Sequence, residues 1–231
     1  MHGSTLRYTG DYPILQSKVD DDYYMDHTVD DKEGLPGAIM TEYSYNPDPF
    51  ESDAVTVVYG HNMLNDSFFS RLKDYQDETF RQEHPYIEIY TPEHIYKYRV
   101  FAAVTYDNRH ILYNYNCRTK EGYQAFLDSL SEVRIMPTWI EDPLPVTTDD
   151  RMIVLSTCNG NHDERFLICA VLTGNNNFYE KRIKKTYPVH RCCYTGSSGS
   201  CDRSVCAASQ TAAGKGTSAG GIHFPGRRQY H

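Results

Sequence analysis

The sequence contains no run of about 18 apolar residues, the length that a membrane-spanning helix needs. No secretory signal is recognisable, and residues 1–7, with His2-Gly3-Ser4 after Met1, are expected to be a leader or a cloning remnant. Positive charge is scarce, because 23 Lys and Arg stand against 31 Asp and Glu, for a net charge of −8. Since phosphate contacts need a basic face, this balance argues against nucleic acid as the main partner.

Several catalytic motifs are also missing. The phosphate-binding loop, the Rossmann glycine fingerprint, the His-Glu-x-x-His zinc motif and the Gly-x-Ser-x-Gly elbow do not occur, which weakens the corresponding enzyme classes. Tryptophan occurs once, at Trp139, whereas tyrosine occurs 20 times, and aromatic side chains fit the pleated surface of a sheet. With 39% hydrophobic residues in 231, the chain can form one domain with a substantial core.

The distribution of charge marks a boundary near residue 180. Residues 1–180 carry 14 basic and 30 acidic side chains, whereas residues 181–231 carry nine basic side chains and one acid. The second segment is rich in Gly, Ser and Cys and has no apolar periodicity. It is interpreted as a tail outside the fold, disordered or non-native, and the alternative is a basic arm for anionic lipids or wall polymers. We therefore expect the folded domain to span residues 8–180.

The cysteines do not predict a metal site. Those of the tail are spaced C-C-x7-C-x4-C, without the paired C-x2-C knuckles of zinc ribbons; they are Cys192, Cys193, Cys201 and Cys206. No metal and no cofactor are expected. Cys117 and Cys169 lie among apolar or strand-like neighbours, and Cys169 in particular is expected to be a buried, inert thiol.

Short β-type runs bounded by turn residues predict a mainly β fold, of the barrel or sandwich kind. The expected strands cover residues 12–16, 54–59, 86–90, 96–106, 151–158 and 165–172. Two apolar stripes predict helices. One contains Phe68, Leu72 and Tyr75 and has Asp66 as its expected N-cap, and the other spans residues 121–132.

Two chemically capable side chains follow expected strands. Cys158 ends the strand Leu155-Ser156-Thr157-Cys158, before a loop rich in Asn and Gly, and His61 follows another strand in Tyr59-Gly60-His61-Asn62-Met63. A cysteine that is rigidly aimed and partly exposed can act as a nucleophile when a base or a positive charge is near it. On these residues alone, a buried thiol and a surface imidazole are the alternative.

The two motifs in this order, followed by Arg165, resemble the class B sortases of Gram-positive bacteria. The resemblance covers roughly residues 8–173 and extends to Tyr12-Pro13-Ile14-Leu15-Gln16, to the helix of Phe68 and Tyr75, and to Arg165-Phe166-Leu167-Ile168. It implies an eight-stranded β-barrel with a few helices, one of them between the sixth and seventh strands, and that helix matches residues 121–132. The tail departs from the family pattern.

The resemblance also implies the chemistry. Cys158 would attack a Thr carbonyl in a C-terminal sorting signal of the Asn-Pro-x-Thr-Asn or Asn-Pro-x-Thr-Gly type, His61 would serve as acid and base, and Arg165 would stabilise the oxyanion. Ser156, Thr157, Asn62 and Tyr123 are candidate substrate contacts, with strand or core packing as their alternative.

The family implies partners and a location. The substrates would be secreted proteins. The amine acceptor would be a peptidoglycan precursor, lipid II, or, in a pilin polymerase, a Lys side chain of another subunit. The domain is expected to act as a monomer on the outer face of the Gram-positive cell membrane, held there by an N-terminal anchor that this sequence does not include. A different class of function is a catalytically silent barrel that binds sorting peptides or wall polymer.

Overall fold

The structure, a computed structural model, describes residues 11–177 and 217–223. In chain order the elements are β1 (Asp11–Gln16), α1 (Tyr23–Asp26), β2 (Ile39–Met40), β3 (Val55–Tyr59), the 3₁₀ helix η1 (Ser70–Gln76), α2 (Glu78–Glu83), β4 (Tyr86–Tyr90), β5 (His94–Asp107), α3 (Ile111–Asn114), α4 (Lys120–Ser131), β6 (Thr138–Ile140), β7 (Met152–Cys158), β8 (Glu164–Asn177) and β9 (Thr217–His223). The expected strands and both helical regions are therefore present, with shifts of a few residues at their ends.

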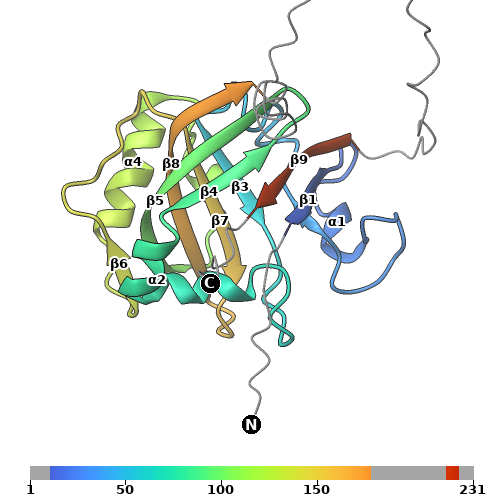
Figure 1. Ribbon diagram of the computed structural model, residues 1–231, viewed down its shortest axis with the longest axis horizontal. Helices are drawn as coiled ribbons and strands as arrows, with labels where there is room; N and C mark the ends of the chain where they lie inside the picture. The colour runs from blue at the N-terminus through green and yellow to red at the C-terminus, as the bar shows by residue number, and fades with distance from the viewer. Residues whose placement is uncertain (1–10, 178–216, 224–231) are drawn as a thin grey trace, which may run out of the picture.

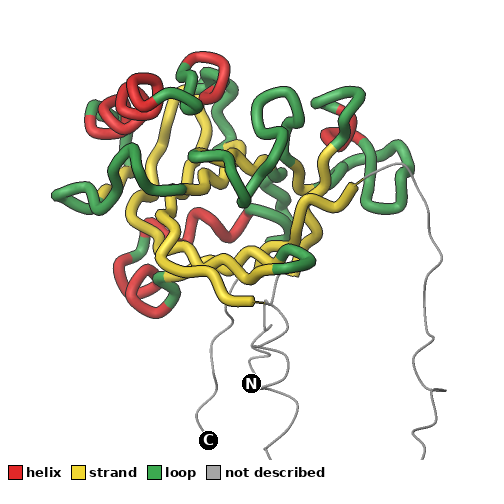
Figure 2. Tube along the Cα trace, turned by 90° about the horizontal axis from the view of Figure 1, so that it is seen from above, coloured by secondary structure: helices red, strands yellow, loops and turns green. Residues whose placement is uncertain are grey.

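The strands form one continuous sheet that curves on itself (Figure 1). Their order is β4-β9-β1-β2-β3-β7-β8-β5-β6, and β4 also pairs with β5. Seen from above, the helical segments lie mainly around the curved strands (Figure 2). This is the mainly β architecture that the run of short strands predicts.

Side chains along the central strands point alternately to the two faces of the sheet, so the core consists of two clusters, one on each face. On β7, Ile153 and Leu155 pack into a cluster with residues of η1, β1 and β4. Met152 and Val154 point to the other face of the sheet and pack against the buried stripe of α4. Because successive side chains of a strand point to opposite faces, Ser156 and Cys158 continue the face that α4 covers.

The first helical region begins later than the sequence predicts. Asp66 is not its cap: η1 begins at Ser70, and the residue before it, Phe69, donates its N–H to the His61 carbonyl at 3.0 Å. This bond holds the chain against the loop that follows β3, so the helical turn starts only beyond it. Asp77 then caps α2, accepting from the N–H of Phe80.

Helix α4 lies between β5 and β6, whereas the family pattern predicts a helix between the sixth and seventh strands. The short strand β6 therefore follows the helix and does not precede it. Its N-cap is Thr119, whose hydroxyl accepts from the N–H of Gly122 at 3.1 Å. The close approach of Gly122 to the Asn116 carbonyl leaves no room for a Cβ at this position. The helix is therefore fixed at its start, and its buried side chains cover the face of the sheet that carries Met152 and Val154.

One part of the expected tail belongs to the sheet. Residues 217–223 form β9, which pairs antiparallel with both β1 and β4, and Ile222 is buried in the core. The expectation that everything beyond residue 180 lies outside the fold is therefore wrong for this segment. Sheet pairing is made by backbone groups, so a strand of small residues can form without the apolar periodicity that was missing. Cys192, Cys193, Cys201 and Cys206 lie outside the described residues.

Candidate active site

Strand direction brings the candidate residues to one edge of the sheet. β3 and β7 are parallel neighbours, with Tyr59 opposite Ser156, so Cys158 at the end of β7 and His61 just beyond the end of β3 lie at the same edge of the sheet. β8 runs antiparallel to β7, and its first residues return to this edge, where Arg165 is directly opposite Cys158. Two such cross-strand residues have Cβ atoms about 4.5–5.5 Å apart.

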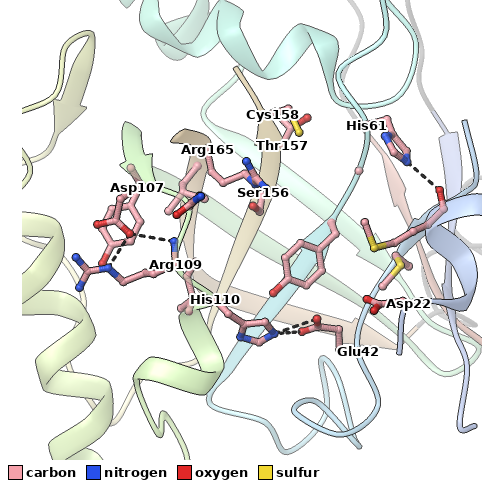
Figure 3. A pocket seen from close by; sticks show the side chains of 18 of the residues that line it. Asp22, Glu42, His61, Asp107, Arg109, His110, Ser156, Thr157, Cys158 and Arg165 are labelled. Carbon is pink, nitrogen blue, oxygen red and sulfur yellow. Dashed lines mark hydrogen bonds and ion pairs between the residues drawn. The ribbon is translucent and has the colours of Figure 1, made fainter. Parts of the chain in front are cut away.

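The same edge receives the end of β5. Tyr106 lies opposite Arg165 in the antiparallel pairing of β5 with β8, so three adjacent strands carry Cys158, Arg165 and Tyr106 in one row. By alternation all three side chains are on the face that α4 covers. A cavity of about 240 Å³ opens here, and Figure 3 shows its lining side chains.

Cys158 is the exposed thiol of the described cysteines, whereas Cys117 and Cys169 are buried. Burial raises the pKa of the Cys117 thiol to about 12, and it raises the pKa of Cys169 as well. Both buried thiols are therefore held in the protonated, unreactive form, and Cys158 is placed where a reagent or substrate can reach it.

His61 is held from the side of α1. Its Nε2 lies 3.1 Å from the carbonyl oxygen of Met25, and since a carbonyl can only accept, this nitrogen carries the proton (Figure 3). Packing explains why a glycine, Gly60, directly precedes the histidine. A Cβ at this position would lie 2.6 Å from the Phe69 ring. The loop can therefore pass close to η1 only with glycine at this position.

Arg165 is anchored through one of its nitrogens. Nη1 donates to the carbonyl of Glu164 at 2.9 Å and approaches that of His162 at 3.5 Å. Within the described part of the chain, its other guanidinium nitrogens make no hydrogen bond. A fixed guanidinium plane with open donors beside Cys158 can bind an oxygen on which negative charge develops.

Three of the predicted substrate contacts, Ser156, Thr157 and Asn62, lie close to Cys158 but differ in their exposure. Ser156 and Thr157 line the cavity but are almost completely buried, and the Thr157 hydroxyl has no hydrogen-bond partner among the described residues. Asn62 is exposed, and its side-chain amide donates to the Cys158 carbonyl at 2.8 Å.

Tyr123 does not line the cavity. Its side chain, only 1% exposed, packs on the inner face of α4 with residues such as Phe126 and Cys117. The expectation that it contacts substrate is therefore wrong, because its place in the helical stripe directs it into the core. Burial is the main cause that raises its pKa, so the phenol stays neutral.

Sequence reasoning missed part of the cavity wall. The corner after β5 contributes Arg109 and His110, and Glu42 follows β2. The His110 Nε2 donates to Glu42 at about 3.0 Å, a hydrogen bond that raises the pKa of the imidazole despite partial burial. Nothing in the local sequence links residues 42 and 110, and only their spatial contact identifies the pair.

Comparison with known proteins agrees with this geometry. The Sortase family, described as the sortase domain, matches residues 9–173. Sortase B of Listeria monocytogenes is 34% identical over 153 residues, which are 66% of this chain and 59% of that protein. Sortase B of Staphylococcus aureus is 26% identical over the same length, which is 60% of that protein. The chain belongs to the sortase family, in class B. It spans about three fifths of the length of these two relatives.

Solved structures show the same fold. The Listeria monocytogenes sortase B structure matches with a TM-score of 0.58 and 30% identity, over 70% of this chain and 86% of that one. The Clostridium perfringens sortase B structure gives 0.59 over 71% and 87%, at 24% identity, which is a likeness of fold alone. The mainly β sortase barrel with a few helices is thus confirmed, and the family is one of cysteine transpeptidases.

The described residues contain neither a membrane-spanning helix nor a cluster of metal ligands. No helix within residues 11–177 is long and apolar enough to cross a membrane. In the part of the chain that the structure describes, no three His, Cys, Asp or Glu side chains gather as metal ligands would.

Thiol reactivity tests the assignment of the cysteines. Treatment of the folded protein with iodoacetamide at neutral pH is expected to alkylate Cys158 and to leave Cys117 and Cys169 unmodified, because burial protects both. Peptide mass spectrometry measures each site, and all three should react in denaturant. Alkylation of Cys169 at a rate comparable to Cys158 in the native protein would reverse the two assignments.

The replacement Tyr123→Phe tests whether this side chain serves the core and not the substrate site. The Tyr123 hydroxyl is buried without a hydrogen-bond partner among the described residues, so its removal is expected to leave the free energy of unfolding unchanged or to raise it by up to about 1 kcal/mol. Chemical denaturation measures this, and peptide cleavage should not change. A raised KM in this variant would return Tyr123 to the substrate site.

Proposed function

We propose that this domain is a cysteine transpeptidase that cleaves a C-terminal sorting signal after Thr and transfers the upstream protein to an amine. Membership of the sortase family supports this proposal. The observation that carries it is the strand register, which sets Cys158 opposite Arg165 while the parallel β3 brings His61 to the same edge. A nucleophile, an acid–base group and an oxyanion donor thereby share one cavity.

The first half-reaction forms a thioester. The Cys158 thiolate attacks the Thr carbonyl carbon, and the carbonyl oxygen takes the negative charge of the tetrahedral intermediate. Arg165 stabilises that oxygen with its open donors. When the C–N bond breaks, imidazolium at His61 gives its proton to the leaving nitrogen, so the downstream segment departs as an amine and the Thr acyl group stays on sulfur.

The second half-reaction reverses these roles. An incoming amine attacks the thioester, neutral His61 accepts its proton, and the C–S bond breaks to restore the Cys158 thiolate. The polar side chains that line the cavity, Ser156 and Thr157, would contact the signal; the unpartnered Thr157 hydroxyl supports this for one of them. No cofactor takes part in the proposed reaction.

The proposed substrates are secreted proteins with an Asn-Pro-x-Thr-Asn or Asn-Pro-x-Thr-Gly signal, and the proposed acceptor is a peptidoglycan precursor. A Staphylococcus aureus sortase B has been solved as a substrate complex, and its fold is similar, with a TM-score of 0.53. The proposed location is the outer face of a Gram-positive membrane. The second candidate within this chemistry is pilin polymerisation, in which the acceptor is a Lys side chain.

A peptide-library assay tests the proposal. Peptides of both signal types are incubated with the protein, with triglycine and a Lys-containing peptide as competing acceptors, and products are identified by mass spectrometry. A thioacyl adduct on Cys158, together with the transfer product, is expected. Binding of signal peptides without adduct or cleavage would identify the silent barrel instead.

A further inference from the structure

The loop that joins β7 to β8 separates the proposed nucleophile from the proposed oxyanion donor. Residues 159–163 connect Cys158 to the start of β8, and all five are exposed. Within the loop, Asn159 accepts from the N–H of Asn161 at 2.9 Å, and Asn161 accepts from the N–H of Asp163 at 3.1 Å. Since no buried apolar side chain anchors this segment, its position depends on polar contacts with its neighbours.

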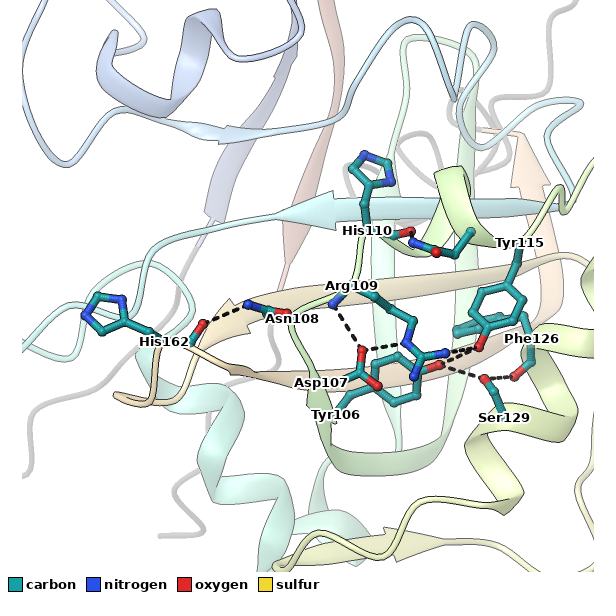
Figure 4. A network of polar contacts seen from close by, with 10 residues as sticks. Tyr106, Asp107, Asn108, Arg109, His110, Tyr115, Phe126, Ser129 and His162 are labelled. Carbon is teal, nitrogen blue, oxygen red and sulfur yellow. Dashed lines mark hydrogen bonds and ion pairs between the residues drawn. The ribbon is translucent and has the colours of Figure 1, made fainter.

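Two asparagine side chains from different elements hold the two ends of this loop. The Asn62 amide, in the segment after β3, donates to the Cys158 carbonyl at 2.8 Å. The Asn108 amide, in the corner after β5, donates to the His162 carbonyl at 3.2 Å (Figure 4). The backbone N–H of Asn108 also donates to the Asp163 carbonyl at 3.0 Å. The β7–β8 loop is thus held by hydrogen bonds from the segments that follow β3 and β5, the strands that flank β7 and β8.

The second contact leads directly to the guanidinium. The His162 carbonyl that accepts from Asn108 is also approached by Arg165 Nη1, at 3.5 Å, and the same nitrogen donates to Glu164. A displacement of the His162 carbonyl would therefore change the acceptors that orient Arg165.

The corner that carries Asn108 is itself well fixed. Asp107 accepts from both the N–H and the Nε of Arg109, at 3.1 and 2.6 Å, and Arg109 Nη1 donates to the Tyr115 hydroxyl at 2.9 Å. The Tyr106 hydroxyl lies 2.7 Å from Ser129 of α4 (Figure 4). Asn108 therefore connects the exposed β7–β8 loop to a part of the sheet that contacts α4 through Tyr106 and Ser129.

We infer that Asn62 and Asn108 are positioning residues, which clamp the β7–β8 loop at its two ends and thereby set the placement of Cys158 and Arg165 relative to each other. The inference rests on the proposed function for its kinetic consequence. Neither side chain needs to touch the substrate for this role. Preorganised groups lose their catalytic effect when they are displaced by about 1 Å, so loss of the clamp should lower turnover.

The variants Asn62→Ala and Asn108→Ala test the clamp. Each removes one amide donor, and we expect kcat on a sorting-signal peptide to fall by about 5- to 20-fold, with KM within about twofold. Hydrogen exchange of the backbone amides of residues 159–163 should become faster in both. The matched control is Asn114→Ala, whose amide donates at 2.7 Å to the carbonyl of His110, the N-cap residue of α3, and which should change neither readout.

A double-mutant cycle separates the clamp from a general loss of stability. Because Asn108 acts through Arg165, the replacement Asn108→Ala should have little further effect on kcat in the Arg165→Lys background. Fully additive effects, or variants with wild-type kcat, would overturn the inference while wild-type cleavage upholds the proposed function. If the wild type cleaves no peptide, the proposed function fails, and hydrogen exchange still decides: unchanged exchange in both variants overturns the clamp.

Discussion

Cys158→Ala is expected to abolish cleavage and transfer while the protein stays folded. The side chain is exposed at the end of β7, so its truncation removes the nucleophile and little packing. No other described thiol can replace it, because Cys117 and Cys169 are buried with raised pKa values. Steady-state kinetics with a sorting-signal peptide and thermal unfolding measure the two effects. A variant that keeps a tenth of wild-type turnover would end the proposed mechanism.

The matched control is Cys169→Ala. This thiol is fully buried on the face that α4 covers, so its loss leaves a small cavity and should lower stability while the chemistry persists. Loss of turnover without loss of stability in this control would contradict the placement of the nucleophile at Cys158.

Arg165→Lys is expected to lower turnover by about 10²–10³-fold, the usual cost of one preorganised oxyanion donor. The formal charge is kept, but the geometry is not. Arg165 uses Nη1 to bind the loop carbonyls of Glu164 and His162 while its other nitrogens remain available beside Cys158. An ammonium is a single point on a flexible stem and cannot hold both places.

Kinetics that separate kcat from KM decide this prediction. The loss should lie chiefly in kcat, because the oxyanion forms only in the transition state. Activity within about threefold of wild type would show that Arg165 only carries a surface charge at the start of β8 and would remove it from the mechanism.

The sequence by itself determined where six of the nine described strands lie, and these are β1, β3, β4, β5, β7 and β8. β4 shows why: it spans the expected residues, since alternating Ile and charged or aromatic residues stop at Thr91-Pro92, and its burial alternates in step. The ends of β3 and β7 were predicted for the same reason, because turn-forming residues follow buried runs. Local patterns set such boundaries, since backbone conformation depends mostly on neighbouring residues. Cys158 and His61 could thus be placed at strand ends before any pairing was known.

The tertiary structure alone decided which strands are neighbours. The parallel pairing of β3 with β7 joins residues about 97 positions apart, and nothing local to either strand specifies the partner or the register. The same holds for the Asn108 corner, the Glu42–His110 contact and β9, which all depend on long-range pairing. Tyr123 shows what a helical pattern leaves open. An apolar stripe predicts that one face of a helix is buried, but it does not predict which part of the protein covers that face. Register matters most here, since a slip of β7 against β8 by one residue would put Cys158 and Arg165 on opposite faces of the sheet.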